Sequence, residues 1–133
     1  MSSSSLPRTV ALIAGAVILS TGVWAMADPR SFFDAVATFE PYNPHFLQDI
    51  GAFQIGLGAV LLVALRQADG LVVALVGVGM GSLAHLVSHV LGTDLGGAPA
   101  VDIPALAILS LALLVAGALR WRELATETRR SRR

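Results

Sequence analysis

Long stretches without a charged residue constrain this chain more than any other feature. Four of them lie at residues 9–27, 50–65, 70–93 and 103–119. Each is about 20 residues long, by itself or with its flanks, and at ~1.5 Å per residue a helix of that length crosses a ~30 Å hydrocarbon core. Only 14% of the residues are charged, whereas about 25% is usual for a soluble domain. The sequence therefore predicts an all-α membrane protein, an antiparallel bundle of four transmembrane helices.

Turn and cap residues set the expected boundaries. Asp28-Pro29 and Asn43-Pro44 are typical helix starts, because the polar side chain caps the first turn and proline fits its first position. We expect helices at about 9–27, 44–66, 71–91 and 103–119. Together they form a transmembrane domain at 9–119, between a disordered N-terminus at 1–8 and a basic cytoplasmic tail at 120–133.

The segment between the first two long helices has an amphipathic pattern. Within residues 31–39, Phe32, Phe33, Val36 and Phe39 fall on one face of a helix. We expect a short helix that lies along the outer membrane surface or folds over the mouth of the bundle. The alternative is a loop whose aromatic side chains touch lipid.

The basic residues are all arginine, and their distribution is uneven. If the helices alternate in direction, eight of the nine lie on one side and only Arg30 lies on the other. The positive-inside rule then places both termini in the cytoplasm of a multi-pass plasma-membrane protein. Ala25-Met26-Ala27 after an apolar stretch also resembles a signal-peptide cleavage site, but the stretch is long enough to span the membrane.

Glycines are frequent in the second and third predicted helices. Gly77 and Gly81 are one turn apart, and this spacing lets another helix approach closely. Because a short turn joins these two helices, we expect their glycine faces to pack against each other.

One transmembrane segment carries a polar stripe. The stripe consists of Ser82, His85, Ser88 and His89. Polar side chains are costly inside a bilayer, so they normally face a protein interior and often mark a functional site. Counting along the helices places Asp49 and Gln54 of the preceding helix at matching depths.

Three interpretations of this stripe stay open. In the first, Asp49 pairs with a histidine, and Gln54 and Ser82 hydrogen-bond across the helices. In the second, a ligand-binding pocket is formed by His85, His89, Asp49, Gln54 and Ser82. In the third, a haem or a metal such as Zn or Fe is bound by His85, His89 and Asp49, with His45 or Asp102 as a further ligand.

Two stretches of the chain resemble a known family. Residues 49–59 (DIGAFQIGLGA) look like the helix-two signature of small four-helix DoxX-like membrane proteins, and residues 79–89 occupy the place where relatives have a glycine and a polar residue. Relatives often carry Arg where His85 stands. The resemblance implies a four-helix fold and a link to redox stress or to quinone-linked oxidoreductases. Residues 41–47 are also similar to actinobacterial membrane proteins, which implies a bacterial source.

Composition narrows the function classes. The chain contains no Cys, so disulfides and thiolate chemistry are absent, and it has no recognisable nucleophile–base–orienter set. An arginine tail beside a membrane does not favour nucleic-acid binding. We expect a non-enzymatic accessory or scaffold subunit of a larger membrane complex, with a protein partner or a second copy of itself. The alternative is an outer-leaflet binding or redox protein that holds a quinone, lipid or metal, and a third hypothesis is a small proton-coupled transporter.

Overall fold

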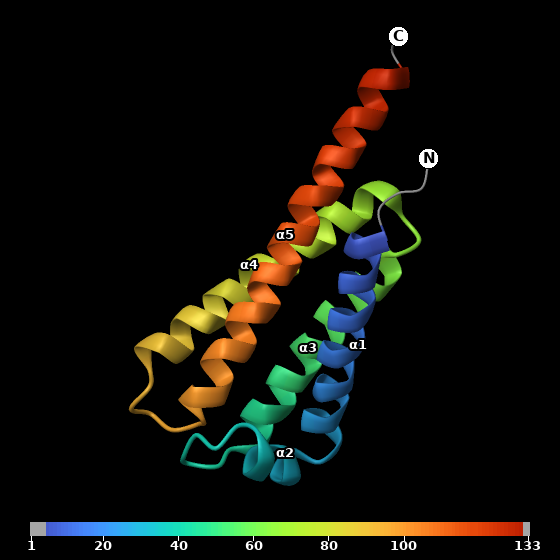
Figure 1. Ribbon diagram of the computed structural model, residues 1–133. Coiled ribbons are helices and arrows are strands. Elements are labelled where there is room, and N and C mark those ends of the chain that lie inside the picture. The colour runs from blue at the N-terminus through green and yellow to red at the C-terminus, as the bar shows by residue number, and fades with distance from the viewer. Residues whose placement is uncertain (1–4, 132–133) are drawn as a thin grey trace.

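A computed structural model describes residues 5–131, with the side chains of all of them except residues 68 and 69 (Figure 1). Its helices are α1 (Ser5–Ala27), α2 (Pro29–Ala35), α3 (Pro44–Ala64), α4 (Ala68–Leu91) and α5 (Pro99–Ser131). All but the short α2 are long and apolar enough to cross a membrane. The predicted all-α fold with four long helices and a short helix between the first two is confirmed.

Several helix boundaries differ from the expected ones, and the largest differences are at α1 and α5, which also begins at Pro99 rather than at residue 103. The α1 helix begins at Ser5 rather than at residue 9, so the part of the expected disordered segment that the structure describes, 5–8, is helical. Residues 1–4 lie outside the described part of the chain. The α5 helix continues without a break to Ser131, because the basic tail is rich in helix-favouring residues and lacks proline and glycine.

The predicted start signals operate as expected at α2 and α3. The Asp28 carboxylate accepts a hydrogen bond from the Ser31 backbone N–H at 3.1 Å, and the Asn43 side chain accepts one from the Phe46 N–H at 3.1 Å. The bonds from the Ser31 backbone and side chain lower the pKa of Asp28 below its usual value.

The α2 helix is shorter than the predicted amphipathic segment and ends at Ala35. Phe32 and Phe33 are buried with Ala25 and Leu47, so α2 covers the ends of α1 and α3. The Trp24 indole N–H donates a hydrogen bond to the Ser31 hydroxyl at 2.8 Å and fixes α2 to α1. Phe39 lies beyond the helix in an irregular stretch, and its N–H donates a hydrogen bond to the Ala37 carbonyl at 2.7 Å.

The long helices pack as two antiparallel pairs, α1 with α3 and α4 with α5. Figure 1 shows that the start of α1 and the end of α5 lie at one end of the molecule, here called the termini end, and that α2 lies at the other, the α2 end. The two pairs meet near the termini end and diverge toward the α2 end. The main buried cluster includes Ala11, Leu61, Leu75 and Leu113 and draws on all four long helices.

Glycines set the seam between α1 and α3. Gly22 faces Gly51 so closely that a Cβ added to either would lie 2.7 Å from the carbonyl oxygen of the other. One level closer to the termini end, a Cβ on Gly58 would lie 2.6 Å from the Leu19 nitrogen and 2.8 Å from the Gly15 oxygen. The glycines are seven residues apart on each helix, so the same face returns after two turns. Backbone therefore contacts backbone along this seam.

The expectation that the glycine faces of the second and third long helices meet is wrong. Gly51 and Gly58 of α3 face α1, and Gly79 of α4 receives Leu113 and Leu114 of α5. A Cβ on Gly77 or Gly81 would have nothing within 4 Å. A short turn keeps α3 and α4 close in the sequence, but it does not make them the most closely packed pair. The closest packing occurs where glycines let another helix approach.

We predict that Gly58→Val loosens the α1–α3 pair. Its branched side chain must push Leu19 and Gly15 away, and overpacking of this kind costs about 1–3 kcal/mol. Gly56→Val is the matched control, because Gly56 lies on the same helix with nothing within 4 Å of an added Cβ. Denaturation in detergent, followed by circular dichroism, measures both variants. Equal stability of the two variants would contradict the glycine seam.

Candidate functional site

A cavity of about 740 Å³ lies between the two helix pairs at the α2 end. All five phenylalanines of the chain line it: Phe32, Phe33, Phe39, Phe46 and Phe53. Leu57 of α3 and Leu106 of α5 are among the aliphatic residues that complete the apolar wall. The cavity is therefore mostly aromatic and aliphatic, and its volume is in the usual ~300–1,000 Å³ range of small-molecule sites.

Three ionisable side chains form a connected row on one wall. The Nε2 atoms of His85 and His89 are 3.1 Å apart. Nδ1 of His89 lies 3.7 Å from Oδ2 of Asp102, and the side chains of these two residues are only 16% and 18% exposed. The same Asp102 oxygen accepts a hydrogen bond from the Ala98 N–H at 2.9 Å, at the start of α5. The row thus runs from the loop before α5 into the cavity.

The loop between α4 and α5 packs against Phe39, which lines the cavity. Gly97 donates a backbone hydrogen bond to the Thr38 carbonyl at 3.2 Å. Both Gly96 and Gly97 have positive φ, and a Cβ on Gly97 would lie 2.6 Å from the Phe39 ring. The Phe39 ring also packs edge-on against His89 at 5.6 Å. Glycine is needed here because the loop must turn and approach an aromatic ring at the same time.

Gln54 supplies a polar group on the opposite wall. It lines the cavity from α3, and its Oε1 atom is buried without a hydrogen-bond partner in the described residues. An unsatisfied buried amide oxygen costs about 1–3 kcal/mol. Because this oxygen has almost no accessible surface, it is not presented to the cavity.

The structure separates the predicted site residues into two groups. His85, His89 and Gln54 line the cavity together. Asp49 is exposed and lies 3.7 Å from His45 on the same helix, and neither of these two residues lines the cavity. Ser82 is half-buried and is also absent from the lining.

The carboxylate beside the histidines is therefore Asp102 rather than Asp49. Matching depth places Asp49 at the level of the histidines but does not determine which way it points. Within residues 5–131, no group of three or more His, Cys, Asp or Glu side chains is placed to hold a metal ion.

The gathering of the phenylalanines is the feature that the sequence reasoning missed. A signal was present, because all five lie between residues 32 and 53. These phenylalanines form one aromatic wall only because α2 and the irregular stretch after it fold over the bundle.

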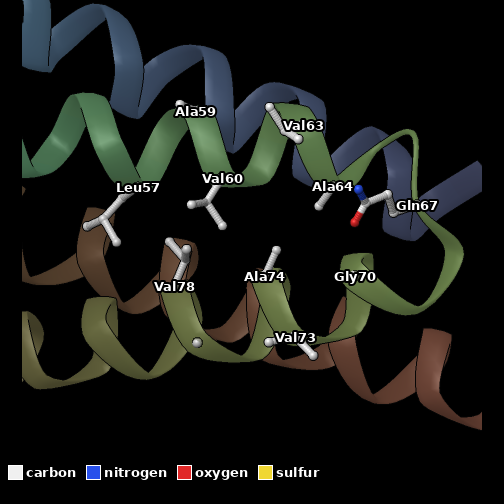
Figure 2. A pocket seen from close by; sticks show the side chains of 11 residues that line it. Leu57, Ala59, Val60, Val63, Ala64, Gln67, Gly70, Val73, Ala74 and Val78 are labelled. Atoms are coloured by element: carbon white, nitrogen blue, oxygen red, sulfur yellow. The ribbon is translucent and has the colours of Figure 1, made fainter.

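A second hollow, of about 650 Å³, lies between α3 and α4, next to the turn that joins them. Figure 2 shows Leu57, Val60 and Ala64 of α3 facing Ala74 and Val78 of α4 across it. Its lining is almost wholly apolar, and Gln67 near the turn is its one amide side chain. It offers packing surface and no set of reactive groups.

The chain matches no protein-family model, and comparisons with curated proteins and with solved structures also find no match. The fold and the site therefore rest on the residues and contacts described above. They define a small all-helical protein with four candidate transmembrane helices.

Proposed function

We propose that this protein binds an uncharged amphiphile, such as a quinone or a neutral lipid, in the cavity at the α2 end. The single observation that carries the proposal is the convergence of all five phenylalanines with His85, His89, Asp102 and Gln54 around one space. An apolar pocket with a few polar groups is the usual form of a small-molecule site.

The charge of the lining favours an uncharged headgroup. Among the described residues that line the cavity, none is Lys or Arg, and Asp102 contributes negative charge. Arg30 lies nearby over the Phe33 and Tyr42 rings, but it forms an ion pair with Asp34 at 2.9 Å. A phosphate headgroup would thus meet a carboxylate and no free cation from the wall.

The polar groups suit a headgroup that both accepts and donates hydrogen bonds. The ring nitrogens of His85 and His89 can donate to a carbonyl or accept from a hydroxyl, according to their tautomers. The body of the ligand would lie against the phenylalanine wall. Its tail would leave between the diverging helix pairs toward lipid.

We predict that Ala105→Phe, which fills the cavity, weakens binding of a short-chain naphthoquinone at least ten-fold. Ala105 lines the cavity from α5. Binding is measured by quenching of Trp24 fluorescence in a Trp121→Phe background, because Trp24 packs 5.4 Å from the cavity-lining Phe32. A fatty-acid anion tests the charge preference and should bind more weakly than the quinone.

Ala118→Phe is the matched control, since Ala118 is an exposed alanine of the same helix outside the cavity. It should bind the quinone as the unmodified protein does. Equal affinity of the Ala105→Phe and Ala118→Phe variants would overturn the proposal.

A role as an accessory subunit is a second proposal. It is supported by Gly77 and Gly81, whose spacing suits close helix contact but which meet no other atoms within the described chain. Gly77 also lines the apolar hollow between α3 and α4. Gly77→Leu should abolish co-purification of a membrane partner or second copy from native membranes while the fold persists. Unchanged co-purification would contradict this role.

We further propose that the α2 end faces the outside of a bacterial plasma membrane, with both termini in the cytoplasm. The arginine distribution supports this orientation, and the resemblance of residues 41–47 to actinobacterial membrane proteins supports the bacterial source. Because the chain has no Cys, single cysteines report topology cleanly. A membrane-impermeant maleimide should label Thr93→Cys in intact cells and Ser131→Cys only after permeabilisation, and the reverse pattern would contradict the proposal.

A further inference from the structure

We infer that His85 and His89 form a two-histidine site for a divalent transition-metal ion, with Asp102 as a positioning residue behind it. The two histidines are four residues apart on α4, so they project from one face of the helix. Their Nε2 atoms are 3.1 Å apart. This inference does not depend on the proposed amphiphile, and it replaces the ligand set that includes Asp49 and His45.

The separation of the two nitrogens fits chelation. Metal–imidazole bonds are ~2.0–2.1 Å long, so nitrogens 3.1 Å apart would subtend about 98° at a shared ion. That angle lies between the ~90° of adjacent ligands in a square-planar site and the ~109° of a tetrahedral one. An ion can therefore bind both nitrogens without a change of helix geometry.

Asp102 selects the nitrogen that faces the metal. Its carboxylate lies 3.7 Å from Nδ1 of His89, which favours a proton on that nitrogen and leaves the Nε2 lone pair free. Histidine ligands in proteins usually have a carboxylate or carbonyl beside their second ring nitrogen, and at 3.7 Å Asp102 acts there through its charge rather than through a direct hydrogen bond. Asp102 is itself held by the Ala98 N–H at 2.9 Å, so the carboxylate is fixed before an ion binds.

The surroundings of the pair define the class of ion. Two protein nitrogens leave further coordination positions to water or to a ligand in the cavity, since no third His, Cys, Asp or Glu within residues 5–131 completes the set. Imidazole ligands without additional carboxylates select Cu²⁺, Ni²⁺ and Zn²⁺ over Mg²⁺ and Ca²⁺. Cu²⁺ should bind most tightly, as the Irving–Williams order requires.

The test is a titration of the full chain, purified in detergent through a tag that contains no histidine. Isothermal titration with Cu²⁺ and Zn²⁺ should give one ion per chain, and Mg²⁺ should give no binding. His85→Ala and His89→Ala should each weaken Cu²⁺ binding at least ten-fold, and Asp102→Asn should weaken it about ten-fold.

His45→Ala is the matched control. His45 is the third histidine of the chain, and its side chain is 84% exposed and lies beside Asp49. Its removal should leave Cu²⁺ affinity unchanged. Electron paramagnetic resonance of the Cu²⁺-loaded unmodified protein should show hyperfine splitting from two nitrogens, and this readout does not depend on the folding of any variant.

Three results would overturn the inference. The first is that Cu²⁺ does not bind, which would mean that the two histidines only form a hydrogen bond. The second is that His85→Ala leaves the Cu²⁺ affinity unchanged, and the third is that His45→Ala lowers it. The titration contains no quinone, and quinone binding is measured separately. Failure of the metal site is thus distinguishable from failure of the proposed function.

Discussion

The close approach of α1 and α3 through glycine is the contact on which the rest of the structure depends. In a bilayer, apolar side chains gain little by leaving lipid, so helices associate through packing and hydrogen bonds. Gly22 against Gly51 and Gly58 against Gly15 bring backbone to backbone and gain that packing. The α4–α5 pair packs differently, because side chains of the facing helix fill the space beside Gly79 and Gly117. Each pair is thus stable along its own seam.

Two tight pairs that meet at one end must leave space at the other. The buried cluster around Leu61, Leu75 and Leu113 joins the pairs near the termini end, and the contact between Gly97 and Thr38 bridges them at the α2 end. The cavity occupies the space between these two connections. The aromatic wall, the histidine row and Gln54 consequently line one space because the pairs diverge. No single helix forms this pocket.

The sequence could predict the helices and not their partners. Charge-free stretches and the caps at Asp28 and Asn43 determine where helices begin, since these are local effects. Helix pairing depends on which glycines approach a backbone far along the chain, and spacing on one helix does not reveal that. The same limit explains the site. The spacing of His85 and His89 predicts that they share a face, whereas the choice of Asp102 over Asp49 depends on which neighbouring helix that face meets.

The central claim is that α3 and α4 diverge while α1 and α3 stay together, and distance measurement between spin labels tests it most directly. The chain has no Cys, so label pairs can be placed freely on exposed positions. One α3–α4 pair, Val63 with Val73, lies near the connecting turn, and another, Phe46 with Val87, lies near the α2 end. The account predicts a clearly longer distance for the second pair than for the first, and a nearly constant α1–α3 distance along their seam. Equal α3–α4 distances at both levels would describe an evenly packed bundle and would contradict the account.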